Sequence, residues 1–557
     1  MKIFKIFLTG FSGFFFSSSG RSGAKHLKIF ALCLSLLVFI PLIIIFSSLF
    51  APSDKIWEHI YENVLSELLL NTFSLIIGVS IGTLIIGVLL AWLTSIYEFP
   101  GRKIFSWTLM MPLAMPVYVI AFVSIGILEY TGPVQTFLRE YYGRELHYFP
   151  RIRSTVGIIL IMTLALYPYV YLLARNAFLS QGKRALEIAQ SLGYSRKSAF
   201  LKSALPLARP WIAGGVLLVI MEALSDFGAV SIFNFNTLTT EIYKAWFSLF
   251  SIQTASQLAS LLVIIVFLFI LLEQRSRYRM RFYQPGKTAF KQDLIKLRGM
   301  KSFIAFFFCL TILLIAFIIP FIQILAWAAS GIKTELNQNY IKILSNSLLL
   351  AGIAALITAG MALLLSFGSR FNRDKFNNLF VKISTLGYAL PGAVLAVAIL
   401  LPFAWLDNNL ITIVDKLFGI ESGRIFSGTL LALLTAYLIR FLAVAHNSIE
   451  SDYHRVSFSI DESAASMGVT GADLLKKVHL PIIRNGIFAA IILVFVDVMK
   501  EMPITLMTRP FGWDTLAVRI FELTSEGEWI RAALPAVTIV LAGLIPVRLL
   551  MKYSAFK

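Results

Sequence analysis

Charge and cysteine are scarce in this chain of 557 residues. Only 14% of the residues are Asp, Glu, Lys or Arg, and two are cysteine. So few charges cannot cover a soluble protein of this size, since 58% of the residues are hydrophobic and the mean hydropathy is +0.80. Cys33 and Cys309 stand far apart without metal-site spacing, so we interpret them as small buried hydrophobic residues and not as a disulfide or a ligand pair.

The signatures of common soluble enzymes are also missing. There is no His-Glu-x-x-His motif, no Gly-x-Ser-x-Gly motif, and the chain has only six histidines. Gly286-Lys287-Thr288 looks like the end of a phosphate-binding loop, but Arg281 stands where that loop needs its first glycine. We therefore predict no catalytic residue, assign no metal site, and expect no cofactor bound by this chain. Its energy source would be an ion gradient or another protein.

What the sequence has instead is a series of apolar segments of about 20 residues, the length of a helix that crosses a bilayer. Twelve such spans are predicted, six in each half, at 28–50, 71–97, 104–128, 155–179, 211–233, 255–273, 302–329, 343–368, 379–401, 426–445, 485–509 and 531–551. The predicted fold class is therefore an all-α integral membrane protein. Because six is even, both halves run in the same direction through the membrane.

The segment 71–240 is repeated 275 residues later in the chain. The matching residues include Asn71 with Asn346, Pro116 with Pro391, Gly193 with Gly468 and Thr240 with Thr515. One offset held over so many positions indicates a tandem duplication. We assign the first repeat to 1–290, with spans 1–6, and the second repeat to 291–557, with spans 7–12.

The net charge of +19 is interpreted as a sign of membrane topology. If the N-terminus is cytoplasmic, most of the 49 Lys and Arg residues lie on the cytoplasmic side, many of them in the loop between the repeats. The acidic residues Glu58, Glu62 and Glu67 then fall in an opposite loop. We expect both termini to be cytoplasmic, the basic residues to contact membrane lipid, and nucleic acid not to be a partner.

Two loops of the same layout follow spans 4 and 10. The first loop (180–210) reads Glu187-Ile-Ala-Gln-Ser-Leu-Gly193, with Pro206 thirteen residues further on, and the second loop (455–485) reads Glu462-Ser-Ala-Ala-Ser-Met-Gly468, with Pro481 thirteen further on. In each we predict a short amphipathic helix that ends at a glycine in the left-handed conformation. A second helix would follow, and the proline would mark the entry to the next span. Such a helix can seat in a groove of a partner; the alternative is a helix that stabilises its own domain.

Both loops resemble the Glu-Ala-Ala loop of ABC importer permeases, which reads Glu-Ala-Ala, three residues, Gly, nine residues, then Ile-x-Leu-Pro. The spacing matches in both, although Ile188 and Ser463 replace the middle alanine. The resemblance implies a type I ABC importer permease fold, in which these loops couple the chain to an ATPase. The coupling residues it implies are Glu187, Ala189, Gly193, Pro206, Glu462, Ala464, Gly468 and Pro481.

The resemblance also implies partners and a location. The partners would be two copies of a cytoplasmic ABC ATPase subunit, which carry ATP and Mg, and a periplasmic substrate-binding protein; the location would be the bacterial inner membrane. The fused, duplicated layout looks most like the permeases of ferric-iron importers, with 222–230 and 497–503 among the supporting stretches. Permeases for thiamine, polyamines or phosphonates are the alternatives. A secondary transporter driven by an ion gradient is another, since it also uses twelve spans and parallel halves.

Four acids stand inside predicted spans 5 and 11, in pairs four residues apart. Each pair is expected on one helix face. Ionised carboxylates at membrane depth are costly and usually mark a pathway or a paired site, and a hard, multiply charged cation prefers oxygen ligands. We predict that they line the cargo path; the alternative is a structural role, with Lys500 neutralising an acid of span 11. The four acids are Glu222, Asp226, Asp497 and Glu501.

Overall fold

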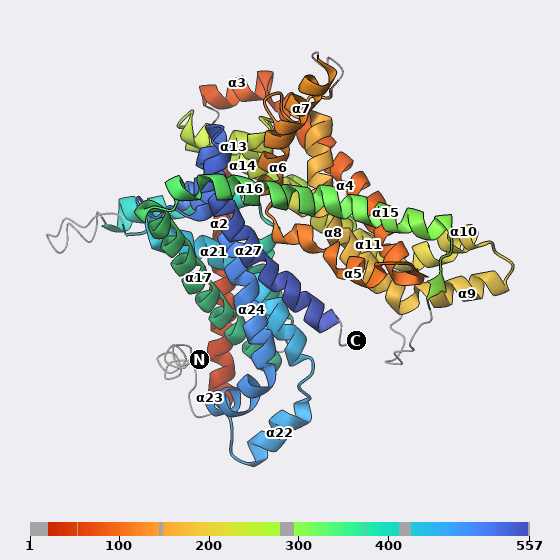
Figure 1. The fold of residues 1–557 in the computed structure, drawn as a ribbon. Coiled ribbons are helices and arrows are strands. Elements are labelled where there is room, and N and C mark those ends of the chain that lie inside the picture. Colours follow the sequence, from red (N-terminus) through yellow and green to blue (C-terminus); the bar gives the residue numbers. More distant parts are fainter. Residues whose placement is uncertain are drawn as a thin grey trace. The chain divides into compact units, whose positions relative to one another are not determined.

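The protein is almost entirely helical in the computed structural model, which describes residues 20–52, 54–143, 149–278, 294–372, 374–411 and 425–554 (Figure 1). Within these residues, twelve helical segments are long and apolar enough to cross a membrane, which confirms the predicted number of spans. The strands described are two short ones, β1 (Tyr97–Glu98) and β2 (Ile295–Lys296), which pair in parallel. The predicted all-α membrane fold is confirmed.

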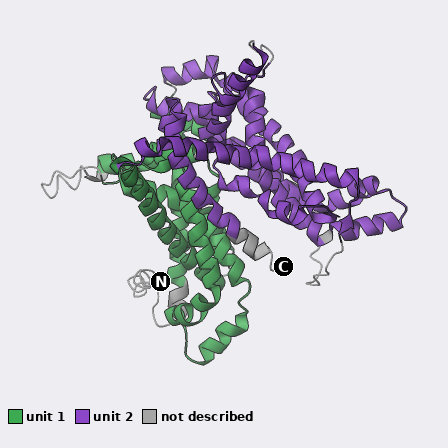
Figure 2. Cartoon of the chain, in the orientation of Figure 1, with its two compact units in different colours: residues 1–52, 252–260, 338–518 green, residues 53–251, 261–337, 519–557 purple. Residues whose placement is uncertain are grey.

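The helices form two compact units (Figure 2). Unit 1 comprises Met1–Pro52, Ile252–Ser260 and Gln338–Val518, and unit 2 comprises Ser53–Ser251, Leu261–Asn337 and Arg519–Lys557. The described elements of unit 1 are α2 (Gly20–Ser47), η1 (Ser48–Phe50), α17 (Gln338–Phe371), α18 (Lys375–Ser384), η6 (Leu386–Ala389), α19 (Gly392–Leu406), η7 (Asp407–Ile411), α21 (Leu430–Tyr453), α22 (Phe458–Ser466), α23 (Gly471–Asp473), η8 (Leu474–His479), α24 (Leu480–Lys500) and α25 (Pro503–Thr508).

Unit 2 contains spans 2–5 of the first repeat, together with spans 7 and 12. Its described helices are α3 (Lys55–Asn63), α4 (Leu65–Ile96), α5 (Arg102–Thr108), η2 (Met111–Ala114), α6 (Val117–Leu128), α7 (Pro133–Tyr142), α8 (Thr155–Ala177), η3 (Phe178–Gly182), α9 (Lys183–Ser191), α10 (Arg196–Ala199), η4 (Phe200–Ala204), α11 (Leu205–Ser225), α12 (Gly228–Ile232), α13 (Leu238–Phe247), α15 (Met300–Leu313), η5 (Leu314–Ile318), α16 (Ile319–Glu335) and α27 (Trp529–Ser554). Two helices, α14 (Ile252–Tyr278) and α26 (Leu516–Ser525), contribute residues to both units.

Unit 1 consists mainly of the second repeat but includes span 1, and unit 2 consists mainly of the first repeat but includes span 7. Span 1, formed by α2, packs in unit 1 on α17, α18 and α19 of the second repeat, where Lys28 forms an ion pair with Asp374. Span 7, formed by α15, η5 and α16, lies in unit 2, where Phe122 of α6 stacks on Trp327 of α16 and Trp529 of α27. The units of packing thus differ from the repeats at 1–290 and 291–557, whose boundaries stay a prediction about the duplication.

The helices of spans 3 and 9 begin later than predicted, because a proline precedes each. Pro116 and Pro391 precede the first residues of α6 and α19, with nearly equal backbone angles (φ −56°, ψ 147° and φ −57°, ψ 145°). The residues before them, Met115 and Leu390, are extended with ψ of 121° and 132°. A proline ring excludes the α conformation from the preceding residue, so the predicted segments 104–128 and 379–401 are wrong as single helices.

Helices α4 and α8 approach closely because glycines of α4 face α8. A Cβ at Gly87 would lie 2.9 Å from Val170 Cβ, 3.0 Å from the backbone nitrogen of Tyr171 and 3.1 Å from the carbonyl oxygen of Tyr167. Gly82 and Gly78, five and nine residues earlier, face the side chains of Thr163 and Ile159 of α8. Small residues at such spacing let membrane helices pack backbone against backbone.

Replacing Gly87 by Ala should destabilise the protein by roughly 1–3 kcal/mol, because the new methyl group overlaps backbone atoms that cannot rotate away. Gly352→Ala in α17 is the matched control, since no neighbouring group lies within 4 Å of the position its Cβ would take. We expect that control to be neutral or to stabilise by up to about 1 kcal/mol. Unfolding of the purified variants in detergent measures both, and equal effects would contradict the close α4–α8 contact.

Candidate functional site

The first loop contains the glycine-capped helix that the sequence predicts. Helix α9 ends at Ser191, and Gly193 has a left-handed φ of +85°. The N–H of Gly193 donates to the carbonyl of Gln190 at 2.9 Å, and the N–H of Tyr194 donates to that of Ala189 at 3.1 Å. This pair of hydrogen bonds is the Schellman motif, which needs a residue that tolerates positive φ.

The second loop repeats this geometry. Helix α22 ends at Ser466, and Gly468 has a φ of +76°. Its N–H donates to the carbonyl of Ala465 at 3.0 Å, while the N–H of Val469 donates to that of Ala464 at 2.9 Å. The predicted left-handed glycine cap is therefore confirmed at both positions.

Each loop directs one apolar side chain outward at its tip. Leu192 is 73% exposed and Met467 is 75% exposed, and the two stand 275 residues apart, each directly before its glycine. The alanines of the two motifs, Ala189 and Ala464, are buried. The helix of the first loop lies at one end of unit 2, and the helix of the second lies at one end of unit 1 (Figure 1).

The part of each loop that follows the glycine is continuous with the next span. In the first loop α10 passes through η4 into α11, and in the second α23 passes through η8 into α24. Both η4 and η8 are π-helical, and each ends directly before the Leu-Pro pair that contains Pro206 or Pro481. A proline has no N–H group to donate within the helix, and its ring clashes with the preceding turn. The wider π turn before it accommodates the ring and the missing hydrogen bond. The prolines thus mark a π turn within one long helix and not a boundary between two.

Asp226 does not lie on the same helix as Glu222, which corrects the expectation of one shared face. Helix α11 ends at Ser225, and Asp226 is extended with ψ 128°. Its Oδ1 accepts the N–H groups of Ala229 at 2.9 Å and of Val230 at 3.2 Å. The carboxylate therefore caps the short helix α12.

Glu501 has the same role in the second repeat and an ion pair besides. Helix α24 ends at Lys500, and Glu501 Oε1 accepts the N–H of Ile504 at 3.3 Å at the start of α25. Its Oε2 lies 3.3 Å from Nε of Arg440, and both side chains are buried. Arg440 also donates to the carbonyl of Leu390.

The other two acids remain inside their helices, three residues before the end of each. Glu222 of α11 accepts a long hydrogen bond from the hydroxyl of Tyr169 at 3.5 Å. Asp497 occupies the equivalent position in α24, and both acids are half-buried. Within the described residues of either unit, no group of three or more His, Cys, Asp and Glu side chains is placed to hold a metal ion.

The segments that follow the ends of α11 and α24 form hydrogen bonds with residues near the starts of spans 2 and 8. Asn71 donates to the carbonyl of Asn236 at 3.0 Å, and Asn346 donates to that of Gly512 at 3.2 Å. One residue further on, Thr72 and Ser347 accept the N–H groups that begin α13 and α26, those of Leu238 and Leu516. Thr515 is therefore equivalent to Thr237, and the sequence pairing of Thr515 with Thr240 is three residues out of register.

Residues 83–281 match the family model described as the binding-protein-dependent transport system inner membrane component. This match covers spans 3–6 of the first repeat and the end of span 2, including the first loop and the broken span with its acids. The chain is a fused permease of the binding-protein-dependent transport type.

Two relatives that match most of this chain are named for ferric transport. The permease is 29% identical over 505 residues to the Fe(3+)-transport system permease protein FbpB 2 of Haemophilus influenzae, covering 90% of this chain and 92% of the relative. It is 22% identical to the ferric transport system permease protein FbpB of Actinobacillus pleuropneumoniae, over 77% of this chain and 62% of the relative. The sulfate transport system permease protein CysW of Escherichia coli K12 is 28% identical over 35% of this chain and 66% of its own length. The permease is a multi-pass inner membrane protein.

Arg440 is the site residue that reasoning from the sequence missed. It stands alone among apolar residues of span 10, and a lone arginine at membrane depth normally has an acidic partner. The sequence therefore indicates that Arg440 has an acidic partner. It does not identify that partner, because Glu501 lies 61 residues later in the chain. Sequence proximity suggested Lys500 as the neutralising cation of span 11, whereas the ion pair of Glu501 is with Arg440.

Replacing Glu501 by Gln should destabilise the permease by roughly 3–5 kcal/mol, because the Arg440 charge then stays buried without its carboxylate. Asp226→Asn is the matched control in the first repeat: the amide oxygen still accepts the two N–H groups of α12, so the loss should stay below about 1 kcal/mol. Unfolding of the purified variants by titration with a denaturing detergent measures both. A Glu501→Gln variant as stable as Asp226→Asn would show that Arg440 does not depend on this acid.

Proposed function

We propose that this permease is the membrane subunit of an ATP-driven importer of ferric iron. The observation that carries the proposal is a continuous helix, present in both repeats, that begins in a glycine-capped loop and ends beside an intramembrane acid. In the first repeat it runs through Arg196–Ser225, and in the second through Gly471–Lys500. At 1.5 Å per residue, 30 residues span roughly 45 Å, enough to cross the membrane from the loop to the acids.

The two loops are the contact with the energy source. Helices α9 and α22 would each dock on one copy of a cytoplasmic ATPase subunit, which binds ATP and Mg. Leu192 and Met467 would enter a groove of that subunit, with Glu187 and Glu462 exposed beside them. A large apolar side chain that is three-quarters exposed at the same place in both repeats favours a partner over a purely structural helix.

Movement of a loop would act on the acids through the long helix. When the ATPase subunits close, α9 and α22 move with them and displace α10–η4–α11 and α23–η8–α24. The far ends of these helices carry Glu222 and Asp497, next to the breaks that Asp226 and Glu501 cap. The breaks let the end of each span move separately from the segment that follows, which would open the path to one side of the membrane at a time.

The orientation follows from the loops and the charge distribution. The loops and both termini would face the cytoplasm, where most of the 49 Lys and Arg residues would then lie. The helices α3 and α7, at the opposite end of unit 2 from α9, would face the periplasm (Figure 1). A substrate-binding protein would deliver the cargo on that side.

Two separate arguments favour ferric iron as the cargo, one from the relatives and one from the chemistry of the proposed path. The relatives that match both repeats are named for ferric transport, whereas the sulfate permease matches only 35% of the chain. Carboxylates on the path suit a hard cation and would repel sulfate. Thiamine, polyamines and phosphonates are the other cargoes that the loops allow, and a gradient-driven transporter is the rival mechanism.

The purified permease should hydrolyse no ATP alone and should support ATP hydrolysis when reconstituted with its ATPase and binding protein, with further stimulation by ferric iron. The reason is that the loops provide a docking surface but no phosphate-binding residues. Phosphate release from proteoliposomes is the measurement, with sulfate, thiamine and a polyamine as competing cargoes. Iron uptake that continues without the ATPase would instead favour the gradient-driven mechanism.

Replacing Glu222 by Gln and Asp497 by Asn together should abolish iron uptake while leaving the amount of assembled complex unchanged. The substitutions keep the shapes of the side chains but remove two negative charges, each of which costs at least about 2.5 kcal/mol at membrane depth, so stability should not fall. Uptake of radioactive iron and co-purification of the ATPase are measured in parallel. Normal uptake by the double variant would remove these acids from the path.

A further inference from the structure

The helix of the second loop is held by a network of buried polar side chains. Asp461 of α22 lies at its centre: Oδ2 accepts Nε–H of Arg370 at 2.6 Å, and Oδ1 accepts Nε2–H of His479 at 2.8 Å. Arg370 comes from the end of α17 and His479 from η8, so one carboxylate connects three elements. The side chains of Arg370 and Asp461 are only 6% and 11% exposed. Charge-assisted hydrogen bonds of this kind are short and directional.

The same network also fixes the turn that leads into α22. Nη2 of Arg370 donates to the carbonyls of Val456 and Ser457, each at 3.0 Å, and its guanidinium lies 4.3 Å from the ring centre of Phe458. On the other side of the network, the hydroxyl of Tyr453 lies 3.4 Å from Nδ1 of His479. Arg370, Asp461, His479 and Tyr453 are called the Asp461 network below.

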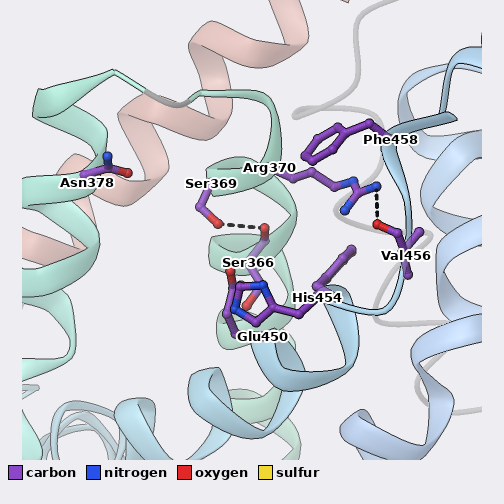
Figure 3. A pocket seen from close by; sticks show the side chains of 9 residues that line it. Ser366, Ser369, Arg370, Asn378, Glu450, His454, Val456 and Phe458 are labelled. Atoms are coloured by element: carbon purple, nitrogen blue, oxygen red, sulfur yellow. Dashed lines mark hydrogen bonds between the residues drawn. The ribbon is translucent and has the colours of Figure 1, made fainter. Parts of the chain in front are cut away.

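A polar cavity of about 360 Å³ lies beside this network (Figure 3). Its lining residues come from α17, α18, the end of α21 and the turn before α22, and include Ser366, Asn378 and Glu450. Figure 3 shows Arg370 reaching from α17 toward Val456, next to the ring of Phe458. On this side the start of α22 faces the cavity. The side chain of Arg370, and not a packed apolar side chain, contacts it there.

The first loop is anchored by different chemistry at equivalent positions. Leu186 and Ala204 stand 275 residues before Asp461 and His479, and both are buried. Helix α9 buries three apolar residues, Ala185, Leu186 and Ala189, whereas the apolar residue that α22 buries is Ala464 alone. Next to α9, an aromatic cluster contains Trp92, whose ring centre lies 5.1 Å from that of Phe178 and 4.4 Å from that of Phe200.

We propose that Asp461 is the positioning residue of the second coupling helix, and that the two loops of this permease are held for coupling by different forces. The first is seated by apolar packing, and the second is held by one carboxylate that binds Arg370 and His479. This inference rests on the proposed docking of both loops to an ATPase. Loss of the Asp461 charge leaves Arg370 desolvated without its partner, and α22 then has one small buried residue to keep it in place. Coupling through the second loop should fail while the first loop stays in position.

The test measures each loop separately in the assembled complex. Cys33 and Cys309 are replaced by Ser, and a single cysteine is introduced as Leu192→Cys or Met467→Cys, two exposed positions at the tips of the loops. A thiol-to-amine cross-linker then reports contact of each loop with the ATPase subunit. Asp461→Asn should lower the cross-linking yield from Met467→Cys roughly tenfold and leave the yield from Leu192→Cys within about twofold.

Two further variants serve as controls. Asp461→Glu keeps the negative charge and should restore most of the yield from Met467→Cys. Leu186→Ala, the matched change in the first loop, should reduce the yield from Leu192→Cys and leave that from Met467→Cys unchanged. Iron-stimulated ATP hydrolysis should fall with Asp461→Asn and recover with Asp461→Glu.

Several outcomes would overturn the proposal. An unchanged yield from Met467→Cys in Asp461→Asn would show that the network does not position α22. Equal loss at both tips would show that Asp461 supports the fold as a whole and not one loop. If neither cysteine cross-links before Asp461 is changed, the docking of the loops itself is wrong, and the role of Asp461 is withdrawn with it.

Discussion

A backbone N–H or C=O inside a bilayer finds no water, so the chain can leave the helical state there only where another group replaces the lost hydrogen bond. The breaks in this permease obey that constraint. Where α11 and α24 end, the carboxylates of Asp226 and Glu501 accept the N–H groups that begin the next short helix. Where spans 3 and 9 begin late, the proline itself has no N–H group to satisfy. The positions of greatest functional interest are thus also the positions where the backbone most needs a specific side chain.

This double demand separates the four intramembrane acids into two kinds. Asp226 and Glu501 are required by the helices that follow them, and Glu501 is also the partner of Arg440. Glu222 and Asp497 lie within regular helix, where the backbone N–H groups bond to carbonyls one turn earlier. A charge that helix geometry does not require is the better candidate for contact with cargo. The long helices that carry these two acids begin in the glycine-capped loops. Each loop and its acid are therefore parts of one helix, and a displacement of the loop would also move the acid.

The duplication preserved the backbone more closely than the side chains that support it. Both loops have the same two capping hydrogen bonds, an exposed apolar tip and a π turn before the proline. Around them, the first repeat uses Trp92, Phe178 and Phe200, whereas the second uses Arg370, Asp461 and His479. If both loops dock on identical partners, as proposed, each has to keep the same shape, and either apolar packing or a buried ion pair can hold that shape. The two halves can therefore be equal in form and unequal in their sensitivity to mutation.

The sequence alone determined the features that depend on neighbours along the chain. Hydropathy predicted twelve spans, and the duplicated spacing predicted the left-handed glycines 193 and 468, because a Schellman cap is made by residues within one turn. Tertiary structure decided what depends on residues distant in sequence. Arg440 meets Glu501, Arg370 meets Asp461, and α2 packs on the second repeat, and no local pattern encodes these pairings. The ends of spans 5 and 11 also escaped prediction, because an apolar run continues through both breaks and hydropathy does not detect a carboxylate that caps the next helix.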